Sequence, residues 1–186
     1  MVENNKNKIE IPTLEDHHYL LFNKEFDTET TSVAIEFIIR RNLMEITPKQ
    51  IKMIINSLGG SVTAAFALID TMKGSNIPIH TFGLGQIASC GLLTFIAGEK
   101  GKRFITPNTT ILSHQYFGVS VGKEHELMAR VKDLNITSER ILKHYNKCTG
   151  LSEKEIKKYL LPAEDVYLTA KEAVKLGIAD KIVEFY

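Results

Sequence analysis

The sequence is poor in cysteine and lacks tryptophan altogether. Its two cysteines, Cys90 and Cys148, stand in apolar or helical stretches and show no CxxC spacing. The sequence therefore predicts neither a disulfide framework nor a zinc site, and we expect no metal and no other cofactor. This cysteine usage favours a reducing compartment, and we expect the cytoplasm, with an organelle stroma or matrix as the alternative.

A charge excess of either sign is missing as well. Lys and Arg number 23 against 22 for Asp and Glu, so the net charge of +1 offers no broad field to hold nucleic acid or an anionic membrane. The longest apolar run, 87–97, is shorter than a membrane span and is interrupted by polar residues and glycine. The polar residues 1–10 have the pattern of neither a signal peptide nor a presequence. We therefore expect a protein that is not exported and that binds neither nucleic acid nor membrane.

What the sequence does contain is an alternation of strand and helix patterns. Its length suits one domain that buries roughly 70% of its unfolded surface, and we expect a flexible segment over 1–18 and a single domain over 19–186. Short apolar runs predict strands at 19–22, 51–55, 79–84, 103–105, 110–112 and 179–185. Helical spacing of apolar residues and capping patterns predict helices at 28–42, 65–72, 89–97 and 123–147, with short helices after Ser152 and Thr169. This alternation indicates an α/β fold with a mainly parallel sheet, in which sites collect at the carboxyl ends of strands.

Two glycine turns, 56–60 and 85–88, follow predicted strands and precede predicted helices. In the first turn, Gly59 and Gly60 let the backbone approach a ligand closely and direct its N–H groups toward an anion. A phosphate could use the same loop, although the Lys-Ser/Thr pair of a P-loop and the G-x-G-x-x-G spacing are both missing. A simple tight turn is the third interpretation.

Ser89 directly follows the second glycine turn and opens a predicted helix. This position exposes a hydroxyl beside the free N–H groups of the helix start, as a nucleophile for acyl transfer requires. A plain helix N-cap is the competing interpretation, because serine is common at that position. The nucleophile elbow of α/β-hydrolases is not predicted, since that motif has glycine two residues before the serine and this sequence has Ile87.

A general base and a residue that orients it complete the requirements of acyl transfer. His114 ends an apolar strand and stands apart from the other histidines, although a lone histidine on a strand is more often structural. Asp165 precedes a strand-like segment, where aspartate is usually a solvated turn residue. Of the remaining histidines, we expect His80 on a strand and the others at the surface: His17, His18, His125 and His144.

Taken together, the motifs of the sequence resemble those of the Clp protease proteolytic subunits, a family of serine peptidases. The resemblance spans roughly 19–186, and its motifs occur in the family's order: INSLGGSVT at 55–63, GQIASCG at 85–91, GKRF at 101–104, PN at 107–108, LSHQ at 112–115, CTG at 148–150, DVYLTAKEA at 165–173 and LGIAD at 176–180. So many ordered motifs are far more specific than a single glycine-rich loop.

The resemblance implies a role for each candidate residue. Ser89 is the nucleophile, His114 takes its proton and Asp165 holds the imidazole in the useful tautomer. The backbone N–H groups of Gly60 and Cys90 form the oxyanion hole. Substrate contacts fall on Gly59, Ser61, Gln115, Tyr116, Phe117 and Gly118.

The resemblance also implies a crotonase-like fold of repeated β-β-α units with a protruding strand-helix handle at about 115–148. Through this handle, two heptameric rings of the same chain stack and enclose a chamber. Inside it, an ATP-independent endopeptidase cleaves unfolded polypeptides, which pair with the backbone of 115–122 as an added strand. A AAA+ unfoldase normally feeds such a chamber.

The sequence departs from the family pattern at three places. Leu58 and Tyr116 replace family prolines, and Asn23-Lys24 replaces a Gly-Gly pair. The polar segment before Tyr19 is short, so we expect an N-terminally short form whose docking to an unfoldase differs. A non-catalytic ring subunit is an alternative, although it would lack a triad residue. A crotonase-type acyl-CoA enzyme is a second alternative, against which the intact Ser/His/Asp set argues.

Overall fold

The computed structural model of the protein describes residues 13–184. A seven-stranded sheet forms its centre, with neighbouring strands in the order β1-β2-β3-β4-β7 and with β5 pairing both β3 and β6. All pairs are parallel except β5 with β6. The strands are β1 (Tyr19–Phe22), β2 (Ile51–Ser57), β3 (Ile79–Ala88), β4 (Arg103–Ile105), β5 (Thr110–Ser113), β6 (Val166–Leu168) and β7 (Lys181–Ile182). The predicted α/β fold with a mainly parallel sheet is confirmed.

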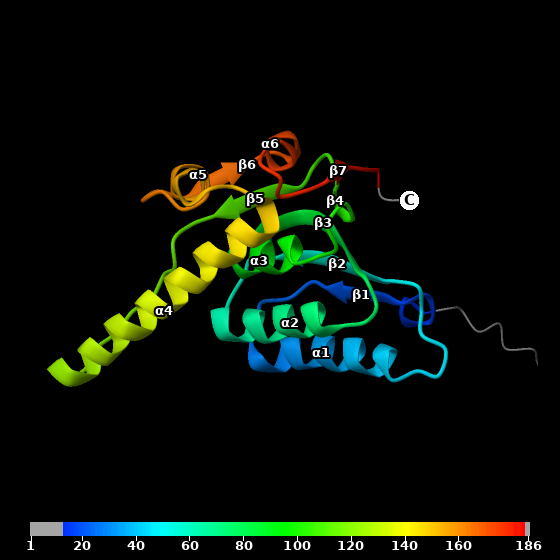
Figure 1. The fold of residues 1–186 in the computed structure, drawn as a ribbon, viewed down its shortest axis with the longest axis horizontal. Helices are drawn as coiled ribbons and strands as arrows, with labels where there is room; N and C mark the ends of the chain where they lie inside the picture. Colours follow the sequence, from blue (N-terminus) through cyan, green and yellow to red (C-terminus); the bar gives the residue numbers. More distant parts are fainter. Residues whose placement is uncertain (1–12, 185–186) are drawn as a thin grey trace, which may run out of the picture.

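The helices lie on two sides of this sheet. Figure 1 shows α1 and α2 side by side below it and α5 and α6 near the opposite side, while α4 projects far beyond the body of the molecule. The described helices are the 3-10 turn η1 (Glu15–His17), α1 (Thr28–Asn42), α2 (Val62–Gly74), α3 (Cys90–Ile96), α4 (Glu124–Thr149), α5 (Glu153–Tyr159) and α6 (Ala170–Lys175). No helix between residues 13 and 184 has the length and apolar character that crossing a membrane requires.

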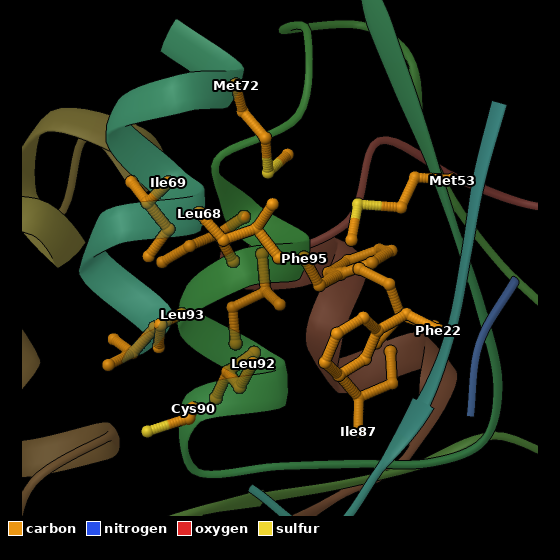
Figure 2. Packing of buried hydrophobic residues seen from close by; sticks show 14 of the residues in the cluster. Phe22, Met53, Leu68, Ile69, Met72, Ile87, Cys90, Leu92, Leu93 and Phe95 are labelled. Carbon is orange, nitrogen blue, oxygen red and sulfur yellow. The ribbon is translucent and has the colours of Figure 1, made fainter. Parts of the chain in front are cut away.

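The short helix α3 is the centre of the hydrophobic core. All seven of its residues are buried, and Figure 2 shows Leu92 and Phe95 packed between α2 and the strands that carry Phe22 and Met53. Complete burial of such a side chain stabilises the fold by roughly 1.5–3 kcal/mol relative to exposure. The residues that begin α3 are therefore held firmly.

Two predicted strand boundaries are wrong. The turn predicted at 85–88 is part of β3, which continues to Ala88 and pairs there with β5. Gly85 has φ 62°, and the Asn56 carboxamide accepts a hydrogen bond from the Gln86 N–H at 3.1 Å, so the strand bends at the glycine without ending. Glycine tolerates this left-handed backbone without steric cost.

The last predicted strand, 179–185, is reduced to the two residues of β7. Before β7, the carboxylate of Asp180 accepts hydrogen bonds from the Arg103 backbone and guanidinium at 2.6–2.9 Å, which fixes a loop where a strand was expected. Residue 185 lies outside the described part. The flexible segment and domain boundary expected around residue 18 stay predictions, because residues 1–12 are not described.

Candidate active site

Ser89 lies at the sharp junction between β3 and α3. Its backbone has φ 53° and ψ −118°, a conformation that costs a non-glycine residue energy and that clusters at functional sites. Its N–H donates to the Leu112 carbonyl at 2.9 Å, which ties the junction to β5. Ser89 does occupy the N-cap position, but its side chain makes no capping hydrogen bond, so capping does not explain this serine.

The glycine turn after β2 packs directly against Ser89. A Cβ placed on Gly59 would lie 2.7 Å from the Ser89 Cβ, and one on Gly60 would overlap the backbone of Phe26. Both glycines have positive φ, 107° and 139°, so a side chain at either position is strained as well as crowded. The tight-turn interpretation is thus correct as far as it goes, and the close approach to Ser89 is an additional feature.

Two backbone N–H groups lie beside Ser89 at this turn. Phe26 bridges the glycine turn through the Gly59 carbonyl at 2.8 Å and the Ser61 N–H at 2.7 Å, which leaves the N–H of Gly60 outside that bridge. Cys90 is the first residue of α3, so its N–H has no acceptor within the helix. The Cys90 thiol donates to the Gly60 carbonyl at 3.2 Å, and burial raises the pKa of this thiol to about 11. The arrangement keeps these two backbone segments together.

His114 follows the last residue of β5 and is half-buried. Its Nδ1 lies 2.6 Å from the Gln115 carbonyl oxygen. Because a carbonyl can only accept, Nδ1 carries the proton in this hydrogen bond, and Nε2 is the free acceptor of the neutral ring. This is the tautomer that a base acting on a serine hydroxyl needs.

Ser89 and His114 line one cavity of about 470 Å³. Five other residues predicted for the site share this cavity: Gly60, Ser61, Gln115, Tyr116 and Phe117. Four predicted residues are not among those that line it: Gly59, Cys90, Gly118 and Asp165. Gly59 and Cys90 nevertheless lie against Ser89 itself.

Residues of α3 and α4 that the sequence analysis did not single out complete the cavity. Leu93, Ile141 and Tyr145 give it apolar walls, and Asp133 and Thr137 extend it along α4. Ile141 and Tyr145 are four residues apart and therefore share one helix face. That spacing was visible in the sequence, but only the packing of α4 over α3 shows that this face reaches Ser89.

Asp165 lies next to His114 by register, but no side-chain hydrogen bond joins the two residues in the described part of the chain. β6 runs antiparallel to β5 and pairs Val166 with Ser113, so one further step along the register places Asp165 opposite His114. Asp165 is exposed, and among residues 13–184 the side-chain hydrogen bonds include none that joins His114 to Asp165 or to Ser89. The sheet thus brings the three residues to one edge, and the hydrogen bonds of a triad are not formed in this conformation.

Buried hydroxyl groups support the strand end that carries His114. The Ser113 Oγ donates to the Leu160 carbonyl at 2.6 Å and lies 3.0 Å from the Tyr145 hydroxyl, which is then the donor to Ser113. Burial raises the pKa of Tyr145 well above its usual range, so this phenol stays protonated. The base of α4 and the end of α5 are thereby joined to β5.

His144 is buried, which corrects the prediction that it lies at the surface. It stands on the inner face of α4, where its Nε2 lies 2.8 Å from the Leu93 carbonyl and its ring meets Phe66 edge-on. Burial lowers its pKa to about 4, and the ammonium of Lys73, 3.2 Å from Nδ1, acts in the same direction. The polar helix around it concealed this inward face.

A mainly parallel sheet thus brings a serine, a histidine and a glycine turn to one cavity at the carboxyl ends of its strands. The family model described as Clp protease matches residues 5–185, and the chain belongs to this family. The resemblance drawn from the motifs is thereby confirmed, and the fold is the crotonase-like fold of the Clp proteolytic subunits. Within residues 13–184, no group of three or more His, Cys, Asp or Glu side chains is placed to hold a metal ion.

Proposed function

We propose that the protein is an ATP-independent serine endopeptidase that cleaves unfolded polypeptides and peptides. The observation that carries this proposal is the placement of Ser89, a strained serine with no capping role, in the same cavity as the Nδ1-protonated ring of His114. Membership of the Clp protease family supports the serine peptidase class in general.

In the proposed reaction, the Ser89 Oγ attacks the carbonyl carbon of the scissile peptide while Nε2 of His114 takes the hydroxyl proton. The N–H groups of Gly60 and Cys90 stabilise the oxyanion that forms. The proton then passes from His114 to the leaving amine, and a water molecule releases the acyl group from Ser89 by the reverse sequence. Asp165 stabilises the imidazolium once its carboxylate accepts a hydrogen bond from Nδ1–H, which keeps its proton.

The segment after His114 is the proposed binding strand for the substrate. Residues 115–121 belong to no helix or strand, and they carry strongly exposed apolar side chains at alternate positions, namely Phe117, Val119 and Val121. An extended backbone with free hydrogen-bonding groups can pair with a peptide regardless of its sequence. Contacts to substrate are proposed for Gly59, Ser61, Gln115, Tyr116, Phe117 and Gly118.

The same region supports self-association. Several apolar side chains on the projecting part of α4 are exposed, and a monomer rarely presents so many together: Leu127, Met128, Val131, Leu134 and Ile136. We propose that these surfaces join copies of the chain into two stacked heptameric rings that enclose the cavities. A AAA+ unfoldase is the proposed partner that delivers unfolded chains, and the cytoplasm is the proposed compartment.

A non-catalytic ring subunit is the second candidate. One observation favours it: neither Ser89 nor Asp165 is hydrogen-bonded to His114 in the described conformation. Catalytic hydrogen bonds that are absent without substrate often form only when substrate binds, and an active peptidase is expected to form them then.

Labelling with a serine-reactive fluorophosphonate followed by mass spectrometry separates the two candidates. The assembled wild-type protein is expected to carry the adduct at Ser89, and Ser89→Ala and His114→Ala are expected to lose it. Ser32→Ala, on the exposed face of α1, is the matched control and keeps the adduct. Wild-type protein that assembles into rings yet carries no adduct would instead establish the non-catalytic subunit.

A further inference from the structure

Gln115 makes two hydrogen bonds, one to His114 and one to the segment that carries Asp165. Its carbonyl oxygen accepts a hydrogen bond from His114 Nδ1–H at 2.6 Å, and its side-chain amide donates to the Leu161 carbonyl at 3.1 Å. Leu161 opens the segment that leads to Asp165. One residue thus contacts the histidine on one side and the aspartate's segment on the other.

The segment 161–165 is attached on both sides to β5 or to the residues directly after it. At its start, Ser113 donates to the Leu160 carbonyl and Gln115 donates to the next carbonyl, that of Leu161. At its end, Val166 pairs with Ser113 in the antiparallel ladder. We call residues 161–165 the Asp165 arch. His114 lies between the two residues that hold the start of this arch.

The two carbonyls at the start of the arch need these partners. Leu160 is the C-cap of α5, and the last carbonyl groups of a helix have no N–H donor within the helix. Leu160 is completely buried and its hydrogen bond from Ser113 lies in the interior, whereas Leu161 is partly buried and its hydrogen bond from Gln115 is exposed. The Gln115 amide therefore adds a second, exposed attachment of the arch beside the buried one from Ser113.

Gln115 also lies in the wall between two cavities. Together with Tyr116 it lines the Ser89 cavity and a second cavity of about 670 Å³, whose other walls include Leu142 on α4 and Leu161 and Pro162 on the arch. A side chain between the arch and the active cavity is well placed to set the separation of Asp165 from His114.

We propose that Gln115 is a positioning residue for the His114–Asp165 pair, a role that rests on the proposed peptidase function. Its carbonyl keeps His114 in the Nδ1–H tautomer while Asp165 is disengaged, and its amide holds the arch so that Asp165 can replace that carbonyl as the acceptor. This role differs from the substrate contact that the family resemblance assigns to Gln115.

Two substitutions test the amide. Gln115→Met keeps the length of the side chain and removes the donor. Gln115→Glu replaces the donor by a carboxyl group that can donate to Leu161 only when protonated, because the ionised form repels the carbonyl. Gln50→Met, at the opposite end of β2 from the glycine turn, is the matched control for the loss of an amide.

Peptide hydrolysis measured from pH 5 to pH 8 gives the first readout. We expect Gln115→Met to lower kcat on the order of 10-fold to 100-fold with KM nearly unchanged, as expected for misplaced catalytic groups. The activity of Gln115→Glu divided by that of wild type is expected to rise as the pH falls, whereas the same ratio for Gln115→Met stays flat. A raised KM with unchanged kcat would restore the substrate role and overturn the proposal, as would a flat ratio for Gln115→Glu.

Hydrogen exchange of the arch gives a readout that does not depend on catalysis. The amides of residues 163–165 are expected to exchange several times faster in Gln115→Met than in wild type or Gln50→Met, because an end of the arch is released. Equal exchange in all three proteins would overturn the positioning role even if the peptidase proves active. If wild type is not labelled at Ser89 but exchange responds as expected, the peptidase proposal fails and the structural link through Gln115 stands.

Discussion

The two halves of the candidate active site are held by different means. Ser89 stands between a central strand and a helix whose seven residues are all buried, and the glycine turn lies against it with no room for one added carbon. His114 stands where β5 ends, half-buried, and is followed by a strongly exposed segment at 117–121. The half with Ser89, the proposed nucleophile, is fixed by packing, whereas the half with His114, the proposed base, depends on a few hydrogen bonds at the edge of the sheet.

This difference indicates where activity can be regulated. A strained serine persists only because the surrounding core determines its backbone, so its position changes little. Single hydrogen bonds at a strand end, each worth about 1 kcal/mol, can be exchanged for others at low cost. We therefore expect assembly and substrate to act on the geometry of His114 and Asp165 and to leave Ser89 where it is.

Removal of the nucleophile is expected to have the largest effect. Ser89→Ala should reduce kcat/KM for peptide hydrolysis by about 10⁴-fold or more, because the acyl-enzyme cannot form. The change also removes no capping bond, so the urea midpoint should stay close to wild type. Retained hydrolysis in this variant would show that Ser89 is not the nucleophile.

The packed half can be disturbed without replacing a residue of the proposed triad. Gly59→Ala places a carbon 2.7 Å from the Ser89 Cβ at a φ of 107°, and should reduce kcat by roughly 10²-fold to 10³-fold, the range for a damaged oxyanion site. Gly74→Ala, where an added carbon meets nothing within 4 Å, is the matched control and should keep wild-type activity. Equal activity of the two variants would mean that the close packing of the glycine turn has no role.

The contribution of buried His144, which bonds to Leu93 of α3, to the free energy of unfolding is expected to depend on pH. Burial lowers the pKa of His144 from 6.5 to about 4. Between these two pH values the unfolded chain is protonated at His144, whereas the folded protein is not. The resulting stability is fully present above pH 6.5 and is lost as the pH falls to about 4, with a total on the order of 3 kcal/mol. Urea unfolding at pH 7, 5.5 and 4.5 measures this loss, and His144→Gln should flatten the profile. An identical slope in that variant would assign the loss to other groups.

Replacement of Asp165 is expected to reduce kcat less than replacement of Ser89. Replacing such an aspartate by asparagine costs about 10⁴-fold where it alone fixes the histidine tautomer. Here the Gln115 carbonyl already holds the Nδ1 proton, so Asp165→Asn should reduce kcat on the order of 10²-fold. Steady-state peptide hydrolysis by the assembled protein is the measurement. A loss near 10⁴-fold would mean that the Gln115 carbonyl releases His114 before every turnover.

Local sequence patterns predicted most of the fold and singled out the glycine turn and Ser89, which the structure brings together. The apolar periodicity and caps of the helices and the short β-branched runs determine their own structure, so their bounds agree within a few residues. The Gly59-Gly60 pair and Ser89 were identified because a turn between strand and helix has a local signature. The bend at Gly85 was missed, since it depends on Asn56 in the neighbouring strand.

The base half was less predictable because long-range contacts decide it. The burial of His144 follows from the packing of α4 over α2 and α3, which the polar sequence of that helix does not reveal. The amide hydrogen bond of Gln115 depends on Leu161, which lies just after α5 and 46 residues further along the chain. Residue type alone could not show that Asp165 reaches the register position opposite His114 without bonding to it.

The projecting helix α4 can act as a lever. Its only buried residues, Ile141, His144 and Tyr145, lie near its C-terminal end, so the 17 residues 124–140 extend about 25 Å beyond this anchor at 1.5 Å per residue. A rigid helix that is pushed sideways at its tip rotates about its anchored turns. Ile141 and Tyr145 belong to those turns and line the Ser89 cavity. A sideways displacement of the tip therefore moves Ile141 and Tyr145, and with them the wall of the Ser89 cavity.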